Sequence, residues 1–342
     1  MRSVTFVVGS GRCGSTALSR IVHAHPDVLS LNEFWASVGT RALPGRAVDG
    51  AGFWRLVAEP HPVFDSMVRS GMPIPEFLHP RAAAGRGEEG AGIPALSLMV
   101  LPHLTDDPDG LLEELKGAVT TWPRRPAPEH HEELFDVLCA RFGRAAVVER
   151  SGYSGHRVPQ LHAAFPGAKF VHMFRDGPDC ALSMSRHAGF RLILLQREIL
   201  TRTGAASADA LTEEHVRSLP PELAGLLDVP FDPALVLDRH LPVAEFGGLW
   251  SQLVTETADH LSRLPREQCA TLAYEDLLDA PRRELSRIAA FFGVEPLPQW
   301  LDTGCAMLDA RHRGAALRLP PGELAALRQQ CAPGTRALKA SG

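Results

Sequence analysis

The sequence has few lysines and no long apolar run. Only three of its 342 residues are lysines, so 32 of the 35 basic side chains are arginines. The formal net charge is −5, whereas nucleic-acid binders and polybasic membrane proteins carry an excess of positive charge. We therefore expect no nucleic-acid partner, and any anion site must be a local concentration of arginines. No apolar run reaches the roughly 20 residues of a membrane-spanning helix, so no membrane span is expected.

Cysteine pairs are also absent. No CxxC pair and no metal-site spacing occurs among the six cysteines, Cys13, Cys139, Cys180, Cys269, Cys305 and Cys331. This pattern is typical of reduced thiols in a cytoplasmic protein rather than of a disulfide framework or a metal site. The first predicted strand begins at residue 4 and leaves no room for a signal peptide, which also favours a cytoplasmic location.

The apolar pattern predicts an α/β fold. Hydrophobic residues make up 45% of the chain, enough for a sizeable core. Predicted helices separate five short apolar runs, at residues 4–8, 28–31, 146–149, 169–174 and 270–273. Strands that alternate with helices predict a mostly parallel central sheet with helices on both faces. A long amphipathic helix is expected at 243–264, and a last helix near 321–331.

Composition divides the chain into a core and two insertions. We expect one domain over 1–342, with its sheet core at about 1–35, 146–190 and 243–300. Proline and glycine are frequent in residues 36–145, which we interpret as an insertion that folds over the sheet and has a flexible tip near 84–94. Residues 190–242 form a second helical insertion, and 301–342 form a C-terminal tail. The sequence does not indicate an oligomeric state.

The most informative stretch is the glycine-rich loop after the first strand. Gly9, Gly11 and Gly14 end the strand, and Ser15 and Thr16 supply helix N-cap chemistry. A strand, a glycine-rich loop and a helix start in this order point free backbone N–H groups at a phosphate.

This loop almost matches a Walker A motif, but Ser15 stands where that motif has lysine. The nearest cation is Arg12, inside the loop. The loop therefore predicts a phosphate site that lacks the lysine which usually binds the γ-phosphate of a nucleoside triphosphate. Cys13 lies where loop N–H groups could lower its pKa.

A second anion site is predicted after the fourth strand. Arg175 follows that strand directly, and Ser183 lies two turns into the next helix. For Arg175 alone, a surface arginine paired with Asp176 or Asp179 would be the simpler interpretation. A single ligand with two separate phosphates explains both this site and the glycine-rich loop.

Four segments resemble sulfotransferases that use 3′-phosphoadenosine 5′-phosphosulfate (PAPS). The loop G-S-G-R-C-G-S-T-A-L resembles that family's 5′-phosphosulfate loop, and F-P-G-A-K-F-V-H-M-F-R-D-G-P-D-C-A-L-S-M-S-R resembles its 3′-phosphate segment. V-V-E-R-S is similar to a strand end where the family often has lysine and this chain has Arg150. L-A-Y-E-D-L-L-D-A-P-R-R-E-L resembles the C-terminal segment whose tyrosine, here Tyr274, lies at the adenine.

The matching segments fall in order and cover about 100 residues at the sheet. They look most similar to tyrosylprotein-sulfotransferase-like and bacterial members, which also carry H-P-D-V followed by a glutamate at the position of Glu33.

The resemblance implies PAPS as donor, adenosine 3′,5′-bisphosphate as product, a hydroxylated acceptor and no metal. It implies Glu33 as the general base, with Arg12 and Arg150 stabilising charge on the leaving phosphate. The expected donor-binding residues are Gly11, Arg12, Cys13, Gly14, Ser15, Thr16, Ala17, Arg175, Ser183 and Tyr274.

Other bases and other functions stay open. Many family members use histidine as the base, and His103, His130 and His131 could serve if the insertion folds inward, although a solvated position is expected for each. The run E-H-H-E-E at 129–133 is interpreted as a solvated helix face rather than a metal site, because adjacent helical residues diverge by about 100°. Arg311 and Arg313 in the tail are given no role.

The alternative functions are a P-loop kinase or NTPase with a degenerate loop, and a non-catalytic nucleotide-binding protein. A kinase needs a metal-binding aspartate after an apolar strand, which the predicted strand ends do not supply. The apolar, proline-rich insertions favour a small or lipidic alcohol as acceptor over a polyanion.

Overall fold

The computed structural model describes residues 2–83, 92–311 and 313–341. Its centre is a five-stranded sheet in the order β2-β3-β1-β4-β5, and all four strand pairs are parallel. The strands are β1 (Val4–Val8), β2 (Val28–Asn32), β3 (Ala146–Arg150), β4 (Lys169–Phe174) and β5 (Cys269–Ala273). All five predicted strands are present, so the prediction of a parallel sheet is confirmed.

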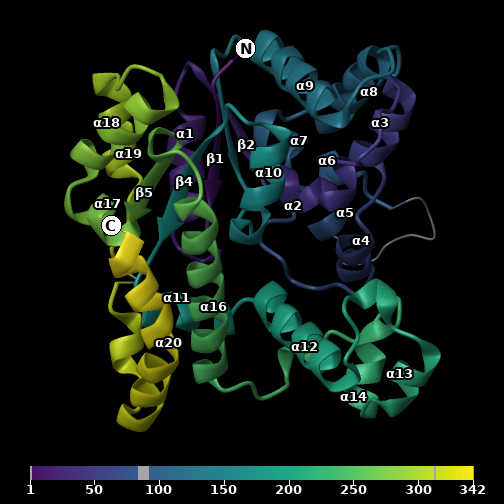
Figure 1. Ribbon diagram of the computed structural model, residues 1–342, viewed down its shortest axis with the longest axis vertical. Helices are drawn as coiled ribbons and strands as arrows, with labels where there is room; N and C mark the ends of the chain where they lie inside the picture. The colour runs from purple at the N-terminus through teal and green to yellow at the C-terminus, as the bar shows by residue number, and fades with distance from the viewer. Residues whose placement is uncertain (1, 84–91, 312, 342) are drawn as a thin grey trace.

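Side chains of β1 alternate between two apolar layers. Phe6 and Val8 belong to one layer and Val7 to the other, as the two-residue period of a strand requires. Because helices supply the rest of both layers, the expected helices on both faces are confirmed (Figure 1).

The first layer is formed largely by the segment between β2 and β3. Its helices are α2 (Phe34–Val38), α3 (Gly50–Ala58), α4 (Pro62–Arg69), α5 (Pro80–Ala83), α6 (Ala95–Met99), α7 (Leu101–Leu104), α8 (Pro108–Val119) and α9 (Ala127–Phe142). Several of them, together with α10 (Val158–Ala164), contribute side chains to the apolar layer that contains Phe6. The expected insertion therefore does fold over the sheet. Of its expected flexible tip at 84–94, residues 84–91 lie outside the described residues.

The opposite layer is formed by the first helix and by helices from the second half of the chain. They are α1 (Ser15–His23), α11 (Gly177–Ser185), α16 (Val243–Ser262), α17 (Tyr274–Asp279), α18 (Pro281–Phe292), α19 (Pro298–Ala306) and α20 (Pro321–Ser341). A separate apolar cluster joins α4 to the second insertion, and Figure 1 shows this insertion next to α4. The helices of this insertion are α12 (Ala188–Thr203), α13 (Glu213–Ser218), α14 (Pro221–Ala224) and α15 (Ala234–Leu237).

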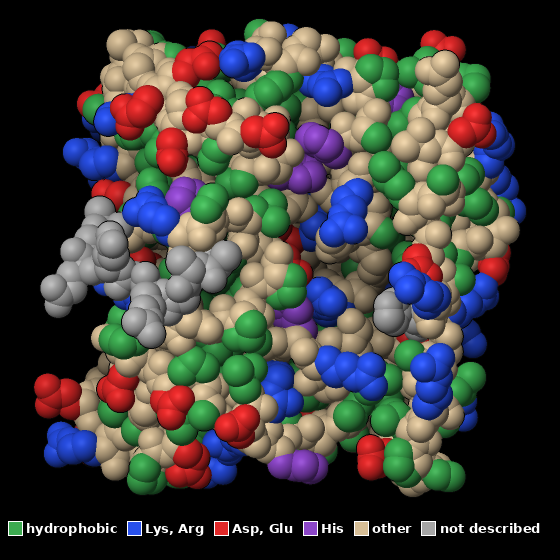
Figure 2. All heavy atoms as spheres, turned by 180° about the vertical axis from the view of Figure 1, so that it is seen from behind, with side chains coloured by type: hydrophobic (Ala, Val, Ile, Leu, Met, Phe, Trp, Pro, Cys, Tyr) green, Lys and Arg blue, Asp and Glu red, His purple; other side chains and the backbone are tan. Residues whose placement is uncertain are grey.

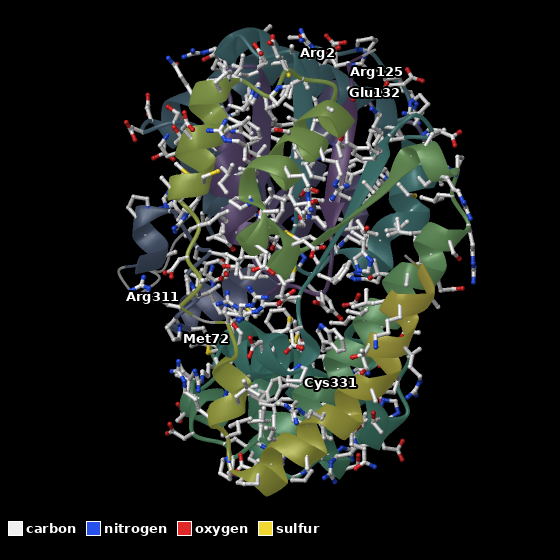
Figure 3. All side chains as sticks on the ribbon, turned by 90° about the vertical axis from the view of Figure 1, so that its left-hand side faces the viewer. Arg2, Met72, Arg125, Glu132, Arg311 and Cys331 are labelled. Atoms are coloured by element: carbon white, nitrogen blue, oxygen red, sulfur yellow. The ribbon has the colours of Figure 1, made fainter. Side chains whose placement is uncertain are left out.

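Helix α20, which carries Cys331 in Figure 3, is ten residues longer than the sequence predicts, because it continues past Pro333. A proline normally interrupts the helical hydrogen-bond ladder. Here the hydroxyl of Ser251 on α16 donates to the carbonyl of Gln330 at 2.5 Å and accepts from the N–H of Gly334 at 3.2 Å. The neighbouring helix thus supplies partners around the proline, which explains why α20 does not end there.

Candidate functional site

The glycine-rich loop depends on backbone angles that ordinary side chains avoid. Gly11 and Gly14 have φ angles of 75° and 88°, and a Cβ atom at Gly14 would lie 2.2 Å from the ring of Tyr274. Glycine at 14 therefore lets the Tyr274 ring pack against the loop. The helix N-cap is Gly14 itself, so the expectation that Ser15 and Thr16 cap the helix is wrong; they are its first two residues.

Two non-glycine residues in the described chain have positive φ angles, Arg12 at 56° and Glu33 at 55°. This left-handed conformation is uncommon for such residues and costs of order 1–3 kcal/mol each. Strained backbone tends to persist where a site needs a side chain in one direction. Arg12 follows β1 and Glu33 follows β2, so both strained positions lie at the carboxyl edge of the sheet.

A cationic cavity of about 580 Å³ lies at this edge. Figure 2 shows Arg, Lys and His side chains around a hollow near the middle of the molecule's rear face. Two carboxylates line the cavity, Glu76 and Asp179, against five arginines: Arg12, Arg20, Arg150, Arg175 and Arg186. The cavity concentrates positive charge in a chain of net negative charge, as the sequence predicts for an anion site. In open α/β sheets, ligands bind beside the strand where the connections reverse direction, which here is β1.

The structure brings the two predicted phosphate segments together in this cavity. Arg12, from the loop after β1, donates from Nε to the hydroxyl of Ser183 on α11 at 3.3 Å. Arg175, which follows β4, lies over the ring of Tyr274 with its guanidinium carbon 5.4 Å from the ring centroid. All four side chains line the cavity. Of the other predicted donor residues, Gly14, Ser15 and Thr16 also line it, whereas Gly11, Cys13 and Ala17 do not.

Arg175 also makes the ion pair considered from the sequence. Its Nη2 lies 3.3 Å from the Oδ2 of Asp179. Asp179 additionally accepts the backbone N–H groups of Gly314 and Ala316, at 2.7 and 2.9 Å. Because Asp179 is held from three sides, it fixes Arg175 in place at the cavity wall.

Of the tail arginines, Arg313 pairs with Asp279 and Arg311 with Asp309, and Figure 3 shows Arg311 at the periphery.

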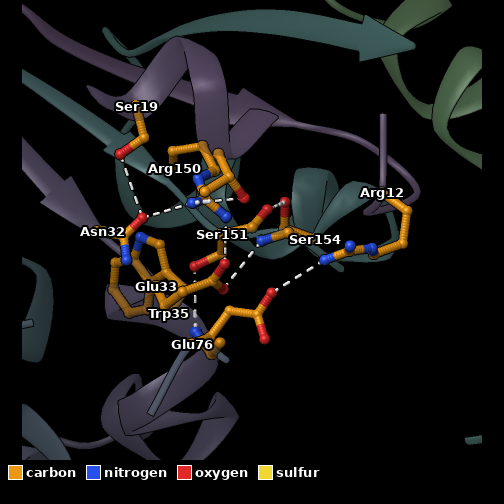
Figure 4. Close-up of polar contacts among 12 residues, drawn as sticks. Arg12, Ser19, Asn32, Glu33, Trp35, Glu76, Arg150, Ser151 and Ser154 are labelled. Atoms are coloured by element: carbon orange, nitrogen blue, oxygen red, sulfur yellow. Dashed lines mark hydrogen bonds and ion pairs between the residues drawn. The ribbon is translucent and has the colours of Figure 1, made fainter. Parts of the chain in front are cut away.

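Glu33 and Arg150 form a buried ion pair at the ends of β2 and β3 (Figure 4). Their side chains are 8% and 4% exposed. The other carboxylate oxygen of Glu33 accepts the N–H of Gly152 at 3.0 Å. Arg150 also donates to Asn32 at 2.5 Å and to Thr16 at 3.4 Å. Its Nε atom is buried and has no hydrogen-bond partner within the described structure.

Burial raises the pKa of Glu33, and the charge of Arg150 and the Gly152 N–H offset part of that rise. A second buried carboxylate is that of Glu149, the neighbour of Arg150 on β3. It accepts hydrogen bonds from Ser151 at 2.6 Å and from the N–H of Trp35 at 3.2 Å. Burial raises the pKa of Glu149 to about 7. Glu149 lines neither of the two site cavities described here.

A second, apolar cavity of about 310 Å³ adjoins the first. Glu33 lines this cavity but not the cationic one, whereas Arg175, Ser183 and Tyr274 line the cationic one but not this one. Its apolar lining comes from both insertions: Ala36, Val63, Phe64, Met67, Ile74, Phe77, Met99, Phe190 and Ile193. Six residues line both cavities and form the wall between them: Arg12, Ser15, Thr16, Glu76, Arg150 and His187.

Glu76 and His187 are site residues that the sequence analysis did not find. Glu76 pairs with Arg12 at 3.2 Å and with Nε2 of His187 at 3.0 Å. Burial acts to raise the pKa of Glu76, but the hydrogen bond and charge of His187 and the charge of Arg12 together hold it below its ordinary value. The proline-rich segment around Glu76 carries no motif, so only its folding over the sheet could reveal this contact.

The expectation that the insertion histidines are solvated is wrong for His130 and His131. His130 and His131 are fully buried, and their Nε2 atoms lie 2.9 and 2.8 Å from the carbonyls of Val48 and Ala42. His131 packs among aromatic rings, including those of Phe34 and Phe53. His103 does line the cationic cavity, where burial and the neighbouring cationic groups lower its pKa to about 4.

The pKa of Cys13 is not lowered, as its position in the loop suggested it could be. Cys13 is fully buried, and burial raises its pKa, with Ser15 and Arg150 offsetting part of the rise. All six cysteines are free, as expected.

Across the described residues, no group of three or more His, Cys, Asp or Glu side chains could hold a metal ion. No helix in the described ranges is long and apolar enough to cross a membrane.

No protein-family model and no curated protein matches the sequence. Solved structures with a similar fold include a sulfotransferase domain from the olefin synthase of Synechococcus PCC 7002 (15% identity, TM-score 0.48, 99% of this chain and 94% of that one). A sulfotransferase domain from the curacin biosynthetic pathway has 13% identity and a TM-score of 0.48 over 97% and 98% of the two chains. A sulfotransferase from Alicyclobacillus acidocaldarius has 17% identity and a TM-score of 0.43 over 99% and 95%. Similarities at this level do not assign a function.

Proposed function

We propose that this protein is a sulfotransferase that uses PAPS to sulfate a hydroxyl group of a small or lipidic acceptor. The observation that carries the proposal is the wall shared by a cationic cavity and an apolar one. A transferase for an anionic donor and an alcohol needs two such cavities, with cations at the junction and a base on the acceptor side. Arg12 and Arg150 line that junction, and Glu33 lines the apolar side alone.

The residues of the cationic cavity suit a donor with two separated phosphate groups. Arg12, Ser15, Thr16 and Arg150 would bind the 5′-phosphosulfate, and Arg175 with Ser183 would bind the 3′-phosphate. The Tyr274 ring would contact the adenine. The buried, unpartnered Nε of Arg150 supports an oxyanion at the junction, because an unpaired buried donor is costly to leave without a partner.

When bound, PAPS supplies the sulfuryl group. The acceptor oxygen forms a bond to sulfur, the bond from sulfur to the 5′-phosphate oxygen breaks, and the electron pair stays on that oxygen. Glu33 takes the acceptor's proton, for which its raised pKa is favourable. Arg12 and Arg150 stabilise the negative charge that develops on the phosphate, the kind of electrostatic contribution that is usually the largest in such transfers.

A kinase or NTPase fits the strand ends less well. A P-loop enzyme of that type holds Mg²⁺ with an aspartate after a core strand and binds the β- and γ-phosphates with a loop lysine. Here β2 is followed by Glu33, β4 by Arg175 and β5 by Tyr274, while β3 ends at Arg150. A non-catalytic nucleotide-binding protein would share the cationic cavity but would not depend on Glu33.

The donor assignment can be tested without knowing the acceptor. Adenosine 3′,5′-bisphosphate should raise the melting temperature of the protein, and ATP with Mg²⁺ should raise it far less. A larger shift with ATP and Mg²⁺ would favour the kinase, and no shift with either nucleotide would contradict both assignments.

A further inference from the structure

The apolar cavity contains one cation that the proposed transfer does not use. Arg157, at the end of the short turn before α10, lines this cavity but not the cationic one. Within the described residues, its guanidinium makes no ion pair and no hydrogen bond, and its Nε atom is buried. Arg157 is half-buried, and its Nε has lost contact with water without gaining a partner, which is unusual because buried donors are normally hydrogen-bonded.

The groups around Arg157 do not neutralise it. Burial lowers the pKa of Arg157, and the neighbouring Glu149 and Tyr153 counteract that effect. The Glu149 carboxylate already accepts hydrogen bonds from Ser151 and Trp35, and burial raises its pKa to about 7, so at neutral pH it carries only part of a charge. Tyr153 is neutral at neutral pH, because its ordinary pKa is 10 and burial raises it further.

A second unpartnered polar group lines the same cavity. The Nδ1 atom of His61 is buried and lacks a hydrogen-bond partner among the described residues. Burial, together with the charges of Arg41 and Arg157, lowers the pKa of His61 to about 4, so the ring is neutral. The loop that carries His61 is held by Arg41, which donates to the carbonyls of Glu59 and Pro60. Arg157 and His61 thus offer a cation and a neutral imidazole, whose Nδ1 donates in one of its two tautomers, in an apolar surrounding.

We infer that Arg157 and His61 form an oxyanion subsite, and that the acceptor is an amphiphile with a hydroxyl group, an apolar body and one carboxylate or phosphate monoester. This inference rests on the proposed function, which identifies the ligand of this cavity as the acceptor. The hydroxyl lies at Glu33, the body contacts the apolar lining that includes Phe64 and Phe190, and the anion binds the guanidinium of Arg157. The guanidinium fork matches either oxyanion, which explains arginine rather than an apolar residue at this position.

The subsite can be tested by binding alone, without donor or turnover. Decanoate, decyl phosphate and the neutral analogue decanamide are titrated by calorimetry into the wild type, below the concentrations at which they form micelles. We expect at least one of the two anions to bind roughly tenfold or more tightly than decanamide, the gain of a charge-assisted hydrogen bond. The anion that binds more tightly identifies the type of head group. Equal binding of all three, or tighter binding of decanamide, would overturn the inference.

Two variants separate recognition of the anion from a structural role. Arg157→Met keeps an unbranched apolar stem and removes the charge, and we expect it to abolish the preference for the anion. Arg157→Lys should restore part of that preference. Equal weakening of the anion and decanamide by Arg157→Met would indicate packing rather than anion recognition and would contradict the subsite.

These outcomes are independent of the proposed transfer. Adenosine 3′,5′-bisphosphate binds in the other cavity, so its effect on the melting temperature of Arg157→Met reports whether the variant is folded. Failure of that nucleotide to bind the wild type would count against the sulfotransferase but would leave the difference between anion and amide intact.

Discussion

Glu33 and Arg150 form a buried ion pair on the wall of the apolar cavity. Glu33 directly follows β2, and Arg150 is the last residue of the neighbouring parallel strand β3. The two residues are 117 positions apart in the sequence, and the register of β2 against β3 brings them together. A carboxylate that is buried and paired with a cation can take a proton while the cation stabilises charge nearby. This pair connects the proposed base to the proposed leaving-group site.

Arg175→Ala should weaken the binding of adenosine 3′,5′-bisphosphate by about 1.5–3 kcal/mol, because a charge-assisted contact to the 3′-phosphate is lost. Isothermal titration calorimetry measures the change. Adenosine 5′-monophosphate, which lacks the 3′-phosphate, is the matched control, and its affinity should change little. An equal loss for both nucleotides would mean that Arg175 shapes the cavity instead of binding the 3′-phosphate.

Glu76→Gln should strengthen the binding of adenosine 3′,5′-bisphosphate about two- to fivefold. Glu76 competes with the ligand for Arg12, and a partly exposed ion pair of this kind contributes up to about 1 kcal/mol. Glu198→Gln is the matched control, because Glu198 pairs with Arg202 and Arg239 outside the cationic cavity. If both variants bind the nucleotide equally well, the effect comes from net charge and not from release of Arg12.

Glu149 should make the stability of the fold depend on pH. Its pKa is about 7 in the folded protein, against an ordinary value of 4.5. The folded state therefore holds the proton more tightly, and this contribution is fully present below pH 4.5 and is lost as pH rises through 7. Relative to Glu149→Gln, which does not titrate, the wild type should lose about 3 kcal/mol of unfolding free energy over that range.

Urea denaturation of the two proteins at pH 4.5, 6 and 7.5 measures this difference. A gap between wild type and Glu149→Gln that stays constant across the series would show that Glu149 keeps its ordinary pKa.

The sheet and the glycine-rich loop could be predicted from the sequence because their signals are local. Runs such as Val4–Val8 are short, β-branched and bounded by turn residues. Gly14 marks a position that needs a positive φ angle and close contact with Tyr274. Arg12, Glu33, Arg150 and Arg175 could be placed at one edge because parallel strands end together.

The remaining features depend on packing between distant segments. Glu76 reaches Arg12 only because the first insertion folds over the sheet, and His61 lines the same cavity as Arg157 for the same reason. His130 and His131 lie in a run of charged residues that is typical of a solvated face, yet aromatic residues from other helices cover both rings. The continuation of α20 past Pro333 depends on Ser251, a residue of another helix.

The most direct measurement is mass spectrometry of acceptors incubated with PAPS and either the wild type or Glu33→Gln. Hydroxylated acids, neutral alcohols and phenols form the panel of acceptors. Glu149→Gln is the matched control, because it removes a buried carboxylate that lines neither cavity. We expect the wild type and Glu149→Gln to add the mass of one SO₃ group to an acceptor. Glu33→Gln should do so about 10²- to 10⁴-fold more slowly, the usual contribution of a general base, while its affinity for adenosine 3′,5′-bisphosphate stays near that of the wild type. Sulfation at an unchanged rate by Glu33→Gln would contradict the assignment of the base, and no sulfated product from any acceptor with the wild type would contradict the proposed function.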